Sequence, residues 1–347
     1  MLALFGLLTA MFAGLTADAV MAQAGSADGD PAAPDGAGGD ATDGDPQGSD
    51  GDGTGPGDLL DWGDPADAPV STDTPPPLAA DQVLMGTGGV DSLFGLDGQD
   101  TVAGDGGGDL LGGRGGDDLL DGGDGDDHAW GGAGDDVMLG GEGHDVMLGE
   151  DGADSIDGGA GDDELAGHEG ADLLAGGDGQ DTLTGGAGAD TLAGGAGDDW
   201  LTGGIDGDSL AGGAGSDTLD GGDSNDLIRG DDDTQADFLN GGDGDDRLGI
   251  GAGDHAHGGD GADSFALSRW MDAGDVAHIA DYVPGEDELV VIYDPAAHPD
   301  PQLSLVSDPG SPDATVMLDG MPVAQVTGGA GLDLSALRLV AFDQLAA

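Results

Sequence analysis

A nine-residue repeat dominates the middle of this chain and limits what it can fold into. Residues 86–229 divide into sixteen nonapeptides without a gap, each with glycine at its first place and aspartate at its sixth. The fourth place is glycine except at Asp206 and Ser224, and the eighth is a large apolar residue except at Ala129. A short period of this kind indicates a solenoid in which each unit packs only on its neighbours.

The order of residues within the nonapeptide predicts a turn followed by a strand. Positions one to six are rich in glycine and aspartate, which suit a tight loop because glycine tolerates positive φ. Positions seven to nine predict a three-residue strand whose eighth side chain points inward while its neighbours point outward. Two repeats then form one flattened coil, and repeat i lies beside repeat i+2. The expected fold is all-β, a parallel β-roll solenoid.

The charge of the chain indicates its ligand. Its 347 residues include 73 Asp and Glu against 5 Lys and Arg, no Cys, and a formal net charge of -68. Such a charge repels phosphate backbones and anionic lipids, which argues against nucleic-acid partners. Without cysteine there is no disulfide framework and no thiolate site. Stacked loops bring their position-six carboxylates to the same gaps, so a cation bound between the loops would turn repulsion into cross-linking.

Calcium suits these gaps better than magnesium, because it accepts six to eight flexible oxygen ligands whereas magnesium demands near-ideal octahedral geometry. The regular array has at most about fourteen gaps between stacked loops. Main-chain carbonyls and the position-six carboxylates are the expected ligands. The predicted metal-binding residues are Asp91, Asp100, Asp109, Asp118, Asp127, Asp136, Asp145, Asp154, Asp163, Asp172, Asp181, Asp190, Asp199, Asp208, Asp217, Asp226, Asp246 and Asp263.

The repeats GGAGDDVML, GGDGQDTLT and GGAGADTLA resemble the G-G-x-G-x-D-x-U-x nonapeptide of hemolysin-type calcium-binding RTX proteins. This resemblance implies a right-handed parallel β-roll that binds multiple Ca²⁺ ions through the position-six aspartates and loop carbonyls. It is strongest from Asp91 to Asp226 and weaker at Asp237, Asp246 and Asp263.

The tail looks like the end of secreted RTX proteins of the serralysin type, which implies an uncleaved C-terminal signal for type I export. The residues that carry this second resemblance are Gly258 to Phe265, Ile279, Asp281, Tyr282, Gly285 and Asp287.

Composition divides the chain into four parts. Residues 1–24 form an apolar leader, either a signal peptide or a short anchor, and residues 25–82 an acidic Asp-, Gly- and Pro-rich tether expected to be disordered. Residues 86–266 form the β-roll, and residues 267–347 a β-rich cap with strands at 288–293 and 315–326. Asp319-Gly320 predicts a hairpin turn within the second run.

The repeat pattern loosens after Arg229. Residues 230–240 carry two extra positions, and residues 250–257 are one position short. In the short unit we expect His255 to replace the ligand aspartate and His257 to replace the core residue. Asp254, His255 and His257 are alternatively candidates for a transition-metal site.

Other short motifs are better explained by composition or by the repeat register than by chemistry. Asp50, Asp52, Thr54, Gly55 and Asp61 fit an EF-hand-like spacing within an Asp-Gly tract. His168-Glu169 lacks the second histidine of a zinc-protease helix, and residues 222–225, which resemble an esterase nucleophile block, keep the repeat register. The outward-facing Trp130 and Trp200 offer a stacking surface for sugars or a protein partner.

Two classes of function remain. The first is an exported, non-enzymatic calcium-binding protein whose roll acts as a structural or interaction module, extracellular and either free or tethered to a membrane by its N-terminal segment. The second is an RTX-type secreted hydrolase, or a fragment of one, whose catalytic domain is absent from this chain. We favour the first, because only an apolar leader and a tether precede the repeats; the protein or glycan partner is unknown.

Overall fold

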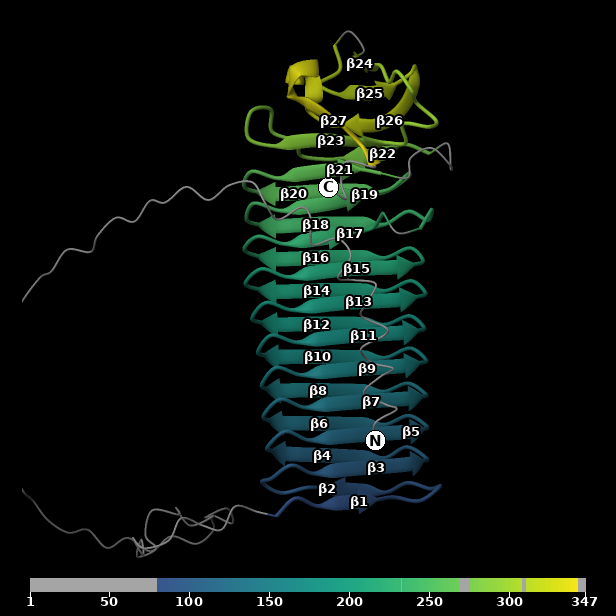
Figure 1. Cartoon of the computed structure of the whole chain (residues 1–347), viewed down its shortest axis with the longest axis vertical. Helices are drawn as coiled ribbons and strands as arrows, with labels where there is room; N and C mark the ends of the chain where they lie inside the picture. The colour runs from purple at the N-terminus through teal and green to yellow at the C-terminus, as the bar shows by residue number, and fades with distance from the viewer. Residues whose placement is uncertain (1–79, 232, 269–274, 308–309, 343–347) are drawn as a thin grey trace, which may run out of the picture. The chain divides into compact units, whose positions relative to one another are not determined.

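Two parallel β-sheets run the length of the repeat region in the computed structural model, which describes residues 80–347 except 232, 269–274, 308–309 and 343–347. The leader, the EF-hand-like tract and most of the tether lie outside the described residues. Successive strands alternate between the two sheets, so each pair of strands forms one coil (Figure 1). Within the described residues, no helix has the length and apolar character of a membrane span.

The odd-numbered strands other than β25 form one sheet of thirteen strands. In order they are β1 (Val83–Met85), β3 (Thr101–Gly106), β5 (Leu119–Asp124), β7 (Val137–Glu142), β9 (Ser155–Ala160), β11 (Leu173–Asp178), β13 (Thr191–Ala196), β15 (Ser209–Ala214), β17 (Leu227–Arg229), β19 (Arg247–Ile250), β21 (Ser264–Leu267), β23 (Glu288–Tyr293) and β27 (Leu337–Ala341).

The second sheet contains the remaining fourteen strands. In order they are β2 (Ser92–Phe94), β4 (Leu110–Gly115), β6 (His128–Ala133), β8 (Val146–Asp151), β10 (Glu164–Glu169), β12 (Thr182–Ala187), β14 (Trp200–Ile205), β16 (Thr218–Asp223), β18 (Phe238–Asp243), β20 (His255–Asp260), β22 (Ala277–Ile279), β26 (Met321–Val326), β25 (Ala314–Leu318) and β24 (Leu303–Val306).

The strands of the regular coils are longer than predicted. Most contain six residues, running from position seven of one repeat to position three of the next, as β9 does from Ser155 to Ala160. The expected three-residue strand was therefore wrong, and the turn is confined to positions four to six. The predicted pairing of repeat i with i+2 is confirmed, since Leu174 of β11 lies opposite Ile156 of β9 and Leu192 of β13.

A single column of apolar side chains forms the core of the roll. The position-eight residues from Val102 to Ile228 are at most 4% exposed, and the column continues through Leu239, Leu248 and Ala256 to Phe265. Each residue contributes one layer between the sheets, so the hydrophobic contribution of a coil is small and must be repeated along the rod.

The sheets continue beyond the repeats into the C-terminal cap. β21 pairs with β23 and β23 with β27, while β22 pairs with β26, all in parallel. β25 and β26 form the predicted hairpin, with Asp319 and Gly320 at φ angles of 51° and 81° in its turn. Short 3-10 helices, η3 (Gly329–Gly331) and η4 (Leu334–Ala336), precede β27. Val316, Leu318 and Val323 are fully buried and continue the apolar core of the roll into the cap.

Glycine at position four is required by close approach of successive turns. Gly161 has a φ of +135°, and a methyl group on its Cα would overlap the carbonyl oxygen of Gly143 in the preceding coil. The same conflict exists at Gly143 and Gly179, so the spacing of coils along this edge depends on the absence of a side chain there.

We therefore expect Gly161→Ala to destabilise the calcium-loaded roll by about 2 kcal/mol or more, because it combines an unfavourable φ with backbone overlap. Gly115→Ala is the matched control, since the nearest atom to its added methyl group is 3.9 Å away and its φ is not positive. Denaturant unfolding monitored by circular dichroism measures both, and equal midpoints would contradict this account.

Candidate metal centre

The position-six aspartates form a ladder along each edge of the roll. The backbone N–H of one aspartate donates to Oδ1 of the aspartate one coil further on, as from Asp145 to Asp163 at 2.8 Å. One ladder contains Asp100, Asp118, Asp136, Asp154, Asp172, Asp190, Asp208, Asp226, Asp246, Asp263 and Asp287. The other contains Asp91, Asp109, Asp127, Asp145, Asp163, Asp181, Asp199, Asp217, Asp237 and Asp254.

In most of these carboxylates the second oxygen has no hydrogen-bond partner in the protein. Oδ2 is buried and accepts no hydrogen bond in fifteen of the predicted metal-binding residues, although an unpaired buried polar atom costs free energy. These fifteen are Asp109, Asp118, Asp127, Asp136, Asp145, Asp154, Asp163, Asp172, Asp181, Asp190, Asp199, Asp208, Asp217, Asp226 and Asp246.

The orphan oxygen faces a space that a main-chain carbonyl also borders. A methyl group built on Gly158 would fall against Asp163 Oδ2 and 2.8 Å from the carbonyl oxygen of Gly176, the first residue of the unit two repeats on. Carboxylate and carbonyl oxygens from two successive coils thus border one small cradle, open only because position one is glycine. This all-oxygen donor set fits calcium.

At the ends of the ladders, the protein itself supplies hydrogen bonds to the Oδ2 atoms. Oδ2 of Asp91 accepts hydrogen bonds from the backbone N–H and hydroxyl of Thr87, and that of Asp100 accepts from the N–H of Leu96. At the other end, Gly251 N–H donates to Asp254 and Val283 N–H to Asp287. The terminal turns therefore satisfy their own carboxylates, whereas the interior turns leave an oxygen free for a cation.

Burial makes these carboxylates difficult to ionise without a cation. Desolvation raises the pKa of Asp136 to about 7, opposed by the hydrogen bond from the Asp118 backbone and reinforced by neighbouring carboxylates such as Asp154. The pKa is likewise raised to about 7 at Asp163, Asp199, Asp208 and Asp226, and to about 6 at Asp127, Asp154, Asp190, Asp246 and Asp254, with desolvation the largest cause at each.

The assignment of the short repeat was wrong. Asp254 is fully buried and occupies the ladder position, and Ala256, 2% exposed, is the core residue. His255 and His257 point outward at positions seven and nine of β20, because the missing residue lies before Asp254, where β19 ends after only four residues. Asp237 and Asp254 are thus ladder members absent from the predicted set. In each repeat the ladder aspartate lies two residues before the buried apolar residue, and this rule would have identified both.

The tail residues have structural roles at the junction of roll and cap. Ile279 is fully buried, and Asp281 accepts hydrogen bonds from the N–H groups of Gly258 and Gly259. The Tyr282 hydroxyl donates to the carbonyl of Asp287, whose carboxylate ends one ladder.

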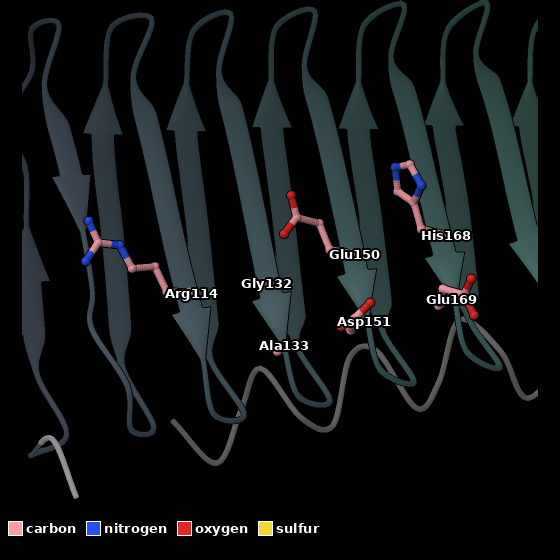
Figure 2. Close-up of a pocket in the computed structure, with 7 residues that line it drawn as sticks. All are labelled: Arg114, Gly132, Ala133, Glu150, Asp151, His168 and Glu169. Carbon is pink, nitrogen blue, oxygen red and sulfur yellow. The ribbon is translucent and has the colours of Figure 1, made fainter. Parts of the chain in front are cut away.

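His168 and Glu169 lie in a β-strand, not in a helix. They belong to β10 and border a shallow groove with Arg114, Glu150 and Asp151 (Figure 2). Arg114, Glu150 and His168 occupy position two with φ between 79° and 88°, where most repeats have glycine. Nothing in this arrangement matches a zinc-protease site.

The remaining sequence candidates keep the repeat geometry. Trp200 is 56% exposed at position seven, and the half-buried Trp130 stacks on His128 with ring centroids 6.2 Å apart. Residues 222 and 223 are the last two of β16, and residues 224 and 225 lie in the turn that follows. Across the described ranges, no three His, Cys, Asp or Glu side chains are clustered as ready-made metal ligands.

Comparison with known protein families agrees with this geometry. The family model of the RTX calcium-binding nonapeptide repeat matches residues 79–111, 112–147, 139–174, 148–183, 167–201, 175–210 and 202–234. No curated protein matches the chain.

The fold and its ladders define a calcium-binding parallel β-solenoid. Residues 79–234 belong to the RTX family of calcium-binding nonapeptide repeats, which bind multiple Ca²⁺ ions. The family matched is a repeat family and not a catalytic one.

The raised pKa values predict that the calcium-free roll folds in acid. Unfolded aspartates titrate near pH 4, so between about pH 4 and pH 7 the folded roll binds more protons and its free energy of unfolding falls as pH rises. Calcium-free protein should give a β-type circular dichroism spectrum near pH 4.5 and lose it by pH 7.5. A spectrum that does not change across this range would contradict the assignment.

Asp163→Asn should raise the calcium concentration at the folding midpoint by roughly fivefold, because it removes one ligand charge from an interior cradle. The asparagine keeps an Oδ1 that can accept the Asp145 N–H. Asp162→Asn is the matched control, since this neighbour is exposed and its Oδ1 accepts the N–H of Gln180. Calcium titration followed by circular dichroism compares them, and equal shifts would rule out a special role for position six.

Proposed function

We propose that this chain is an exported calcium-binding repeat protein whose roll folds on binding Ca²⁺ outside the cell and then acts as a structural or interaction module. The row of buried carboxylates with unpaired Oδ2 atoms carries this proposal. The calcium ligands would be the predicted aspartates of the interior turns, because Asp91 and Asp100 already accept hydrogen bonds from their own turns.

The balance of free energies supports folding coupled to calcium. Strands are about 4.8 Å apart, so each ladder places like charges one strand spacing from each other in a desolvated edge. The ion pairs of Arg229 with Asp231 and of Arg338 with Glu288 involve other carboxylates. Neutralisation of the interior carboxylates at neutral pH therefore requires protons or metal ions, and metal binding supplies folding free energy.

The calcium dependence supports an extracellular site of action. Extracellular calcium modules bind in the range of about 10⁻⁴ to 10⁻³ M, far above cytosolic calcium concentrations. The chain would stay expanded and soluble inside the cell through repulsion among its 73 acidic residues. Calcium outside would trap the folded form and favour export by mass action. The serralysin-like tail supports type I export.

A structural or interaction role fits the roll better than catalysis. Its outer faces are regular columns of position-seven and position-nine side chains, and only repeats are matched among known families. A rigid rod with a repeating surface is suited to spanning a distance or presenting copies of one binding surface.

The purified chain should be unfolded in chelator at pH 7.5 and become β-rich in millimolar calcium, while equal magnesium leaves it unfolded. Fractionation of the producing cells should find the folded protein in the medium or at the cell surface. A β-rich spectrum in chelator at this pH, or folded protein in the cytoplasm at resting calcium, would end the proposal.

A further inference from the structure

Three histidines gather on the outer face of the second sheet where the roll meets the cap. His255 and His257 lie two residues apart on β20, so both side chains point away from the core. His278 on β22 is the direct cross-strand neighbour of His255. The three Cα atoms form a triangle with sides of about 4.8 Å across the strands and about 6.6 Å along β20.

Two of the imidazoles already lie against each other. The rings of His255 and His278 stack with centroids 4.8 Å apart and an interplanar angle of 9°. On its other face, His255 stacks on Phe238 of β18 with centroids 5.0 Å apart. Phe238 therefore limits the movement of His255 in one direction and leaves its edge accessible to solvent.

The third imidazole is oriented by a carboxylate. Nδ1 of His257 is hydrogen bonded to Oδ2 of Asp281, and Asp281 is itself fixed by the N–H groups of Gly258 and Gly259. Because an ionised carboxylate only accepts hydrogen bonds, Nδ1 donates to Asp281, and Nε2 is the ring nitrogen that remains to bind a metal ion. The His257 side chain is 56% exposed, so the imidazole can be reached from solvent. A carboxylate behind a histidine is the usual support of a metal-ligating imidazole.

We propose that His255, His257 and His278 bind one divalent transition-metal ion of the zinc type at the end of the roll. Three imidazoles and a water complete a tetrahedral zinc site. The three imidazoles do not form a ready-made metal cluster in this structure. Binding of one ion would require His255 and His278 to leave their stacked arrangement and turn their ring nitrogens toward His257. Calcium does not compete, because it prefers oxygen ligands, whereas imidazole suits zinc, copper and nickel.

The position of this site would give it a structural role different from that of the calcium cradles. β20 is the last strand of the second sheet with a complete repeat turn after it, and β22 leads into the cap. A metal ion held by both strands would cross-link the roll to the cap. It would strengthen a junction at which β20 and β22 share only the pairs His255–His278 and Ala256–Ile279.

The test is zinc titration of the full chain in saturating calcium, followed by calorimetry and, with Co²⁺ as substitute, by visible absorption. We expect one saturable site per chain and a Kd at least tenfold weaker in His255→Ala and His278→Ala. His128→Ala is the matched control, because His128 is also an exposed position-seven histidine of the same sheet but lies far along the rod, on β6. It should bind zinc like the parent chain.

A chemical measurement on the unmutated chain keeps the proposal testable if a variant does not fold. Zinc should protect His255, His257 and His278 from diethylpyrocarbonate in calcium-saturated protein, and His128 should react equally with and without zinc. Circular dichroism in calcium separates a loss of zinc binding from a loss of the roll. Absence of saturable zinc binding, or zinc binding unchanged in the folded His255→Ala and His278→Ala variants, would overturn the proposal.

Discussion

The structure depends on one repeated interaction, in which a position-six carboxylate accepts the backbone N–H of the equivalent aspartate one coil earlier. This bond uses Oδ1 and draws Oδ2 into the same buried edge, as at Asp163. The geometry that aligns successive coils therefore also accumulates unneutralised charge. The apolar column, one residue deep per repeat, is too thin to offset this accumulation alone. A divalent cation removes the conflict without breaking the alignment.

Much of this architecture could be predicted from the sequence because the period is strict. Gly and Asp at fixed places specify the turns, and alternation around Leu174 or Leu192 specifies which side chain is buried. Pairing at a distance of two repeats follows from the geometry of a flattened coil. The length of the strands could not be predicted in this way. Positions one to three resemble a glycine-rich loop in the sequence, but in the structure they pair between coils. Tertiary pairing of extended glycines overrides their low strand propensity.

The candidate site was predictable where the repeat is regular and not where it changes length. At Asp237 an insertion precedes the aspartate, and at Asp254 a deletion moves it relative to the preceding glycines. In both cases the buried residue two places later identifies the ladder member better than the turn does. The hydrogen bonds that complete Oδ2 at Asp91 and Asp254 depend on local turn geometry, which a sequence pattern does not determine.

Repeat units of unequal length near the C-terminus fix the register of the stacked coils. Most ladder bonds join residues 18 apart, but the spacing becomes 20 at Asp217–Asp237 and at Asp226–Asp246, and 17 at Asp237–Asp254 and at Asp246–Asp263. Within the uniform part, a displacement by one whole coil would replace each contact with a nearly identical one. The coils of unusual length, with spacings of 20 and 17 residues, have only one correct partner. They therefore specify a single register for the whole stack, which the uniform coils alone would leave undefined by whole coils.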